Sequence, residues 1–298
     1  MLATETSHYS VTTEKGTFDF DGDRKVHWFS FDSWYDYIEA AENGETDCNY
    51  RASREPNRRG WHGASLKDTW ELAKTGWKEG TALLQQEIKS FENIMPSRRV
   101  RRETVMDITG PGVLDFGRWA TGHPEAWMVQ QESEVADSHN GNIIRMVFNI
   151  SSSSGVSTGE MMRKGATVVG LIDLLEQAGK RVELDLVSGT RGSGHSIRTV
   201  LRVKESSAPV DIERLAFALA NPASFRRVCF SLWEQAPFEA RKACDIPGGY
   251  GMPEDFAALV DDKAIYIGTS SLERSMSEAV RVAWVTQQLA EQGVVFED

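Results

Sequence analysis

Apolar residues follow a different spacing before and after about residue 140 of this 298-residue chain. In the later part, apolar stretches of strand length alternate with longer stretches whose apolar residues recur every three or four positions. We expect strands at residues 142–150, 181–189, 197–203, 227–234 and 264–270, and helices at residues 158–178, 211–220 and 271–292. This order predicts an α/β fold with a mostly parallel sheet and helices on both faces. The hairpin formed by the second and third strands is expected to supply one antiparallel edge strand.

The first 140 residues are richer in aromatic residues and in loops, and they hold seven of the nine tryptophans. Apolar spacing and capping residues predict three helices, at residues 30–42, 65–75 and 78–94. Residues 107–127 mix glycine, proline and apolar residues, and we expect a packed irregular segment with one or two helical turns. We therefore divide the chain into an aromatic-rich N-terminal α/β region, residues 1–140, and an α/β domain, residues 141–298.

Composition and charge narrow the class of protein. The chain carries 33 basic and 44 acidic side chains, a net charge of −11, which argues against a surface devoted to nucleic acid or to anionic membrane. It has no apolar run of bilayer-spanning length, its first residues lack the features of a secretory signal, and its three cysteines show no paired spacing. We therefore expect a cytoplasmic protein that has no disulfides and does not bind membranes.

Common catalytic motifs are missing from the sequence, including zinc-site spacings, a nucleophile elbow and a Walker loop. Gly189, Gly192 and Gly194 follow a predicted strand. A second strand comes next, where a phosphate loop would need a helix, so we interpret these glycines as a hairpin turn. The sequence therefore favours a non-enzymatic protein and leaves enzymatic activity open.

A serine-rich loop follows the strand predicted at residues 142–150, with Asn149, Ser151 and Ser153 at alternate positions. This loop and the order of the elements resemble von Willebrand factor A-type domains, which carry the motif D-x-S-x-S there. The resemblance implies a Rossmann-type sheet whose upper edge holds a divalent cation such as Mg²⁺ through oxygen ligands, with further ligands near Asp211 and Thr269. Because Asn149 replaces the family's aspartate, we expect a degenerate, weakened metal site. The alternative is a serine loop that only caps the next helix.

Three segments resemble an uncharacterised family of bacteriophage and mobile-element proteins: residues 61–80, 106–128 and 147–184. The first segment contains G-x-S-L, L-A and G-W-x-E-G in one register between Gly63 and Gly80. The resemblance implies a protein of phage or plasmid origin that acts inside the bacterial host cell, and it implies no particular activity.

These observations lead to three hypotheses for function. We expect a protein-interaction module that binds an unidentified protein partner at the top of its sheet, through Asn149, Ser151 and Ser153. An alternative is a nucleic-acid-associated accessory protein that uses an arginine-rich strip on an acidic body. That strip comprises Arg98, Arg99, Arg101 and Arg102, with Arg51, Arg54, Arg58 and Arg59 as further contacts. The other interpretation of residues 97–104 is a solvated connector. A metal-dependent enzyme is the third hypothesis, although the sequence shows no cluster of carboxylates or histidines for it.

Overall fold

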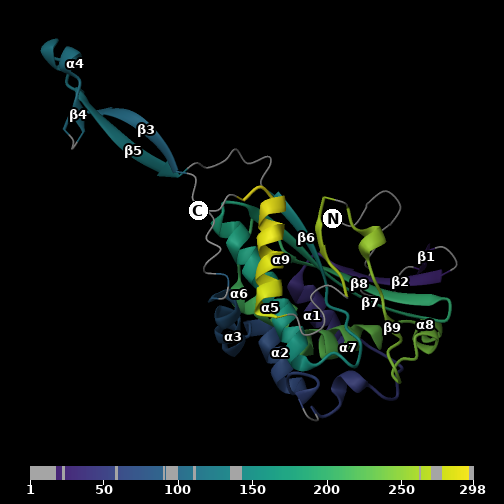
Figure 1. Ribbon diagram of the computed structural model, residues 1–298. Helices are drawn as coiled ribbons and strands as arrows, with labels where there is room; N and C mark the ends of the chain where they lie inside the picture. Colours follow the sequence, from purple (N-terminus) through teal and green to yellow (C-terminus); the bar gives the residue numbers. More distant parts are fainter. Residues whose placement is uncertain are drawn as a thin grey trace.

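A computed structural model of the protein describes residues 18–21, 24–57, 60–89, 91, 100–109, 112–134, 143–261, 263–269 and 277–294. Its largest element is a seven-stranded sheet in the order β1-β2-β8-β7-β6-β10, with β9 pairing to β7 (Figure 1). The strands are β1 (Phe18–Asp21), β2 (Arg24–Phe31), β6 (Ile143–Asn149), β7 (Arg181–Gly192), β8 (His195–Lys204), β9 (Met252–Pro253) and β10 (Ile265–Ile267). The α/β class predicted from the sequence is confirmed.

The sheet is mixed in strand direction. Strand β6 runs parallel to β7 and to β10, and β2 runs parallel to β8, whereas β7 and β8 form the predicted antiparallel hairpin. The expectation that this hairpin ends the sheet is wrong, because β2 pairs along β8 from Lys25 opposite His195 to Phe31 opposite Leu201. The sheet therefore includes residues from both sides of position 140.

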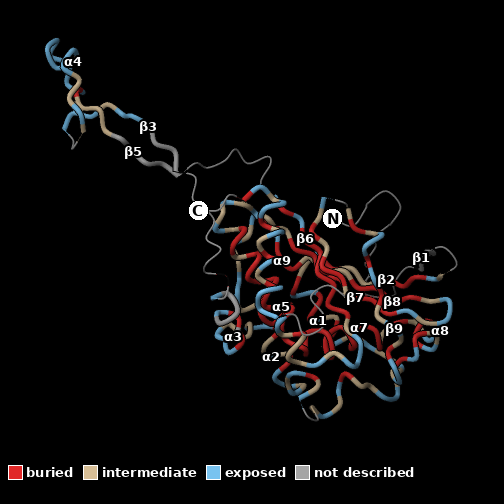
Figure 2. Tube along the Cα trace, viewed as in Figure 1, coloured by how far each residue is buried: buried red, intermediate tan, exposed pale blue. Residues whose placement is uncertain are grey.

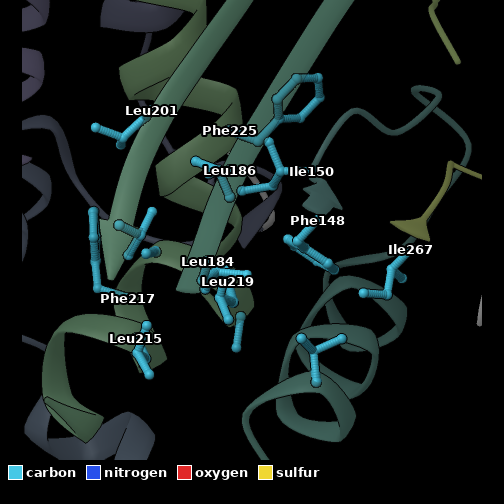
Figure 3. Packing of buried hydrophobic residues seen from close by; sticks show 14 of the residues in the cluster. Phe148, Ile150, Leu184, Leu186, Leu201, Leu215, Phe217, Leu219, Phe225 and Ile267 are labelled. Carbon is cyan, nitrogen blue, oxygen red and sulfur yellow. The ribbon is translucent and has the colours of Figure 1, made fainter. Parts of the chain in front are cut away.

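The α-helices that pack on this sheet lie against one of its faces, not against both as predicted. They are α1 (Trp34–Asn43), α2 (Leu66–Thr75), α3 (Lys78–Lys89), α5 (Thr158–Gln177), α6 (Ile212–Leu215), α7 (Phe230–Trp233), α8 (Phe238–Ala243) and α9 (Glu278–Glu291). Among the described residues, every one of these helices contributes buried apolar side chains to the same core cluster. Figure 3 shows part of this cluster, with Phe148 beside Ile267 of the sheet and Leu184 beside Leu219 of the segment that also carries Phe217.

The opposite face of the sheet is covered by residues 254–261, which include the 3₁₀ turn Ala257–Leu259. Its core is a smaller, separate cluster of six buried side chains, namely Val26, Trp28, Val147, Val187, Phe256 and Val260. A loop thus buries the apolar side chains of this face, where the sequence predicts a second layer of helices.

The strand predicted at residues 227–234 is wrong, because this segment is helical. A π-helix at Ser224–Cys229 continues directly into α7. All residues from 221 to 234 are buried, so the segment lacks the one-sided apolar pattern that separates a helix from a buried strand. The helix predicted at residues 211–220 is confirmed as α6 followed by a π-helix at Ala216–Ala220.

The predicted helices of the first part are also confirmed, although α3 is helical only to Lys89 and residues 90 and 92–94 of that prediction lie outside the described residues. In α1 the buried face consists of Trp34, Tyr37, Ile38 and Ala41. The Ser65 side chain caps α2 at its start, and Gly76, with a φ of 88°, ends it. Of the last predicted helix, residues 278–291 form α9, and residues 271–276 lie outside the described part of the chain.

Residues 100–134 form a second, three-stranded sheet, which we call the arm and which Figure 1 draws apart from the main sheet. It consists of β3 (Val100–Asp107), β4 (Val113–Leu114), the short helix α4 (Phe116–Ala120) and β5 (Trp127–Glu134), with β5 in the middle. The predicted helical turn is confirmed as α4. The expected packing of residues 107–127 is wrong, because their large apolar side chains are mostly exposed.

Candidate functional site

Two of the residues expected at the upper edge of the sheet use their polar atoms inside the protein. The Asn149 amide donates to the Glu254 carbonyl oxygen at 2.8 Å and to the Tyr266 hydroxyl at 3.1 Å, and its Oδ1 accepts from the Ser151 amide. The Ser151 hydroxyl accepts from the Gly189 amide at 2.8 Å and donates to the Gly189 carbonyl at 3.2 Å. Both residues are fully buried. They join strand ends to one another and offer no polar atoms to a partner.

A lysine ammonium occupies the place where the sequence suggested a metal ion. Lys164 projects from α5, is 5% exposed, and donates to the carbonyl oxygens of Gly268 at 2.7 Å, Asn149 at 3.3 Å and Thr269 at 3.5 Å. The ends of β6 and β10 therefore meet around a cation that belongs to the protein. Within the described residues, no group of three histidine, cysteine, aspartate or glutamate side chains is placed to hold a metal.

The other two predicted ligands do not join this cluster. Ser153 is exposed on the loop before α5. Asp211 lies at the other end of the strands. It follows the end of β8, and because β8 runs antiparallel to β7 and β6, this end of the sheet is the one where β6 begins. Its side chain caps α6 by accepting from the Arg214 amide at 3.0 Å. Asn149, Ser151 and Thr269 are thus brought together, and Asp211 is not.

The arginine-rich strip lies only partly within the described residues. Arg98, Arg99, Arg58 and Arg59 fall outside them, and Arg101 and Arg102 are described only as backbone in β3. Arg51 donates to the buried Glu234 at 2.7 Å, and Arg54 lies beside it on the 3₁₀ turn Ala52–Arg54. Nucleic-acid binding therefore stays a prediction from the sequence.

Sequence reasoning missed two arginines of the π-helix at Ser224–Cys229, because Arg227 begins the segment taken for a strand and Arg226 directly precedes it. Arg226 donates to the carbonyl oxygens of Trp61 and Val156, and its guanidinium lies 4.3 Å from the centre of the Trp61 ring. Arg227 donates to the carbonyls of three residues between 53 and 64. Burial lowers the pKa of Arg226 to about 10. Both guanidinium groups thus connect surrounding loops to the core through backbone carbonyls, and they are not available to bind a phosphate.

The tip of the arm carries the largest exposed apolar side chains that lie close together in sequence. Val113 is 68% exposed, Phe116 69%, Ile108 62% and Trp119 57%. The Phe116 and Trp119 rings lie 5.3 Å apart on one side of α4. Figure 2 shows this end of the arm as exposed, in contrast to the buried interior of the main sheet. Protein surfaces rarely leave several such side chains together without a function.

Local interactions hold this tip in shape. Asp115 caps α4 by accepting from the amides of Gly117 and Arg118, and its own amide donates to the Ala126 carbonyl at 2.8 Å. The Arg118 guanidinium donates to the Glu125 carbonyl at 3.3 Å. The exposed rings are therefore presented on an ordered turn, which lowers the entropy lost when a partner binds.

A groove of about 260 Å³ lies at the other candidate site, at the carboxyl ends of β2 and β8. Its lining includes the first residues of α1 and α6, with Tyr35 and Asp211 among them. Ligands of α/β sheets commonly bind beyond the carboxyl ends of parallel strands. The sequence indicated Asp211 as a candidate, but for a different edge of the sheet.

These features define an α/β protein with a mixed sheet, a loop-covered second face and a three-stranded arm. The chain matches the family model described as a domain of unknown function, DUF7192, over residues 10–295, and it belongs to this family. No curated protein and no solved structure matches it. Among the described residues, no helix has the length and apolar character needed to cross a membrane. The family description assigns no activity, so function has to be argued from the sites themselves.

Proposed function

We propose that the protein is a protein-interaction module that contacts its partner through the tip of the arm. The observation that carries this proposal is the exposure of Ile108, Val113, Phe116 and Trp119 at the tip of the arm, with Phe116 and Trp119 on the capped helix α4. Large aromatic and aliphatic side chains of this kind form the energetic centres of protein interfaces. The upper edge of the main sheet is a poorer candidate, because Asn149 and Ser151 use their polar atoms internally.

The charges beside the apolar residues indicate the chemistry of the partner. Asp107, Asp115 and Glu125 surround the tip, with Arg118 as the basic side chain among them. A protein surface that offers an apolar hollow with a basic rim would complement this arrangement. An anionic membrane would repel the same carboxylates, so we favour a protein over a lipid surface.

The origin and the finer fold class remain part of the proposal. The sequence resemblances support a phage or mobile-element protein of the host cytoplasm, with a von Willebrand factor A-like arrangement in residues 141–298. A divalent cation has no assigned role in the proposed contact, because the arm tip does not involve the serine loop.

Site-specific photo-cross-linking tests the proposal directly. A photoreactive phenylalanine analogue placed at Val113 in the full chain should give a discrete covalent adduct in a bacterial lysate. The same analogue at Phe238, a ring that is 58% exposed on α8, is the matched control and should give none. Replacing Phe116 and Trp119 with serine should abolish the adduct, whereas Phe238→Ser should leave it unchanged.

Two results contradict the proposal. One is an adduct that forms equally from positions 113 and 238, which would indicate non-specific apolar contact. The other is the absence of any protein adduct together with binding to anionic vesicles that depends on Phe116 and Trp119, which would assign the tip to a lipid surface.

A further inference from the structure

The groove at the carboxyl ends of β2 and β8 is built from two parts of the chain far apart in sequence. One wall is the start of α1, with Asp32 and Tyr35, and the other is the end of β8 and the start of α6, with Glu205 and Asp211. The floor is apolar, because Trp34, Val203 and Leu215 are all nearly buried there. Its volume of about 260 Å³ suits a small organic molecule.

The basic side chains of the lining are already neutralised by carboxylates. The Arg202 guanidinium lies 2.5 Å from Asp185, and the Lys204 ammonium lies 2.7 Å from Glu176. Arg214 lies 3.4 Å from Asp211. These bases therefore have little charge left with which to attract an anion.

The N-terminal ends of α1 and α6, which lie at the groove, already have side-chain acceptors for their backbone amides. The Ser33 hydroxyl accepts from the Asp36 amide at the start of α1, and the Asp211 carboxylate accepts from the Arg214 amide at the start of α6. Since the protein itself caps these first turns, an anionic ligand would displace or repel existing groups.

The acidic side chains of the lining are less fully paired. Asp32 has no hydrogen bond or ion pair among the described residues, and it is exposed to solvent beside the groove. Glu205 is exposed and lies 3.3 Å from Arg202, which also binds Asp185 and Glu183. The groove thus joins an apolar floor to a rim with excess negative charge.

An aromatic ring completes the site. Tyr35 is 59% exposed, and the Arg214 guanidinium lies 5.3 Å from its ring centre and donates to its hydroxyl at 3.2 Å. This contact fixes the orientation of the ring and leaves much of its surface accessible. A flat apolar group could pack there.

We propose that this groove binds a small organic cation with an apolar or aromatic body, the cationic end facing Asp32 and Glu205. The inference does not depend on the arm, because the groove lies in the main sheet. Amines and guanidinium compounds with an aromatic or alkyl body belong to this chemical class.

Three probes of nearly the same shape test the assignment of charge on the full chain. Tyramine is cationic, N-acetyltyramine is neutral, and 4-hydroxyphenylacetate is anionic. Isothermal titration calorimetry should show tyramine binding at least about tenfold more tightly than either analogue, and added salt should weaken its binding.

Variants locate the site. Asp32→Asn and Glu205→Gln should each weaken tyramine about three- to fivefold, as expected for partly exposed ion pairs. Glu239→Gln is the matched control, because Glu239 is exposed on α8, at the end of β8 opposite to the groove. Asp32 and Glu205 are exposed, so their substitution should leave the circular dichroism spectrum unchanged.

Each other outcome overturns the proposal. Equal affinity for the three probes would mean that the groove does not select charge, and tighter binding of 4-hydroxyphenylacetate would make it an anion site. Failure of tyramine to bind at millimolar concentration, or equal weakening by all three variants, would exclude the groove as its site.

Discussion

The guanidinium of Arg198 is held in a bidentate pair with the carboxylate of Glu254, at 2.7 and 3.0 Å, and each side chain is 5% exposed. The same guanidinium lies 5.2 Å from the Trp28 ring centre and 5.9 Å from that of Phe256. Arg198 belongs to β8 and Glu254 to the loop that covers the second face of the sheet. This ion pair therefore links the loop to the sheet, together with the hydrogen bond from the Asn149 side-chain amide to the Glu254 carbonyl.

Removing the charge of Glu254 should destabilise the protein. Glu254→Gln removes the carboxylate charge from a buried bidentate ion pair, and we expect the free energy of unfolding to fall by about 3 kcal/mol in urea titrations. Glu42→Gln breaks the exposed pair with Lys74 and should cost less than about 1 kcal/mol. If both variants lose a similar free energy of unfolding, the buried pair contributes no more to stability than the exposed one.

The buried ammonium of Lys164 gives a second prediction. Lys164→Met removes the charged donor that joins the carbonyl oxygens of Asn149, Gly268 and Thr269 in the interior. We expect a loss of about 2 to 4 kcal/mol, measured by chemical denaturation. A loss below about 0.5 kcal/mol would mean that solvent replaces the ammonium without cost.

Metal dependence follows from the same geometry. Because Lys164 supplies the positive charge between β6 and β10, neither Mg²⁺ nor EDTA should change the midpoint of thermal unfolding of the unmodified protein. Differential scanning calorimetry at fixed ionic strength checks this. A rise in the midpoint with Mg²⁺ that disappears in Asn149→Ala would instead support the cation suggested by the serine loop.

Two glycines of α5 should respond in opposite directions to the same substitution. A Cβ at Gly165 would lie 2.2 Å from the Leu219 carbonyl oxygen, so Gly165→Ala must push α5 away from the neighbouring π-helix, at a cost of about 1 to 3 kcal/mol. A Cβ at Gly159 meets only the end of Arg163 at 3.6 Å. Gly159→Ala should therefore stabilise the protein by up to about 1 kcal/mol, through helix propensity. Equal effects in thermal unfolding would contradict the close contact.

Acid should weaken the fold through His27. Burial lowers the pKa of this side chain from 6.5 to about 4. The unfolded chain then binds a proton that the folded chain does not, so the free energy of unfolding falls as the pH drops from about 6.5 towards 4. The loss reaches about 3 kcal/mol below pH 4. His27→Gln has no titrating group there, and its unfolding free energy should vary less over this pH range. An unchanged slope would exclude His27 as the source.

Periodicity predicted the elements in which apolar residues recur at the spacing of a helix or a strand. The Trp34, Tyr37, Ile38 and Ala41 stripe and the alternation of Val182, Leu184 and Leu186 both point to their structures directly. The segment at 224–233 is buried all round and carries Arg226 and Arg227, so neither period was visible. Strand β2 could have been found from its apolar residues, of which Val26 and Trp28 face one side of the sheet and Phe29 and Phe31 the other, but its partner β8 is remote in sequence.

The predicted site was only partly correct for reasons of chain direction. The ends of β6 and β10 meet as expected, since the two strands are parallel, and this brings Asn149 near Thr269 through Lys164. The sequence alone could have excluded Asp211 from the site at the end of β6. A hairpin returns the chain, so the residues that follow its second strand lie at the other end of the sheet. The exposed arm tip could not be predicted, since Phe116 and Trp119 resemble core residues until the packing is known.

The pairing of β2 with β8 has a consequence for expression of parts of the chain. A fragment restricted to residues 141–298 would lack β2, and the backbone amides and carbonyls of β8 along that side would have no ladder to join. Bare strands of this kind recruit other strands in solution. Such a truncated product should assemble into insoluble material or exchange strands between copies, and adding back residues 18–31 in trans should restore its solubility.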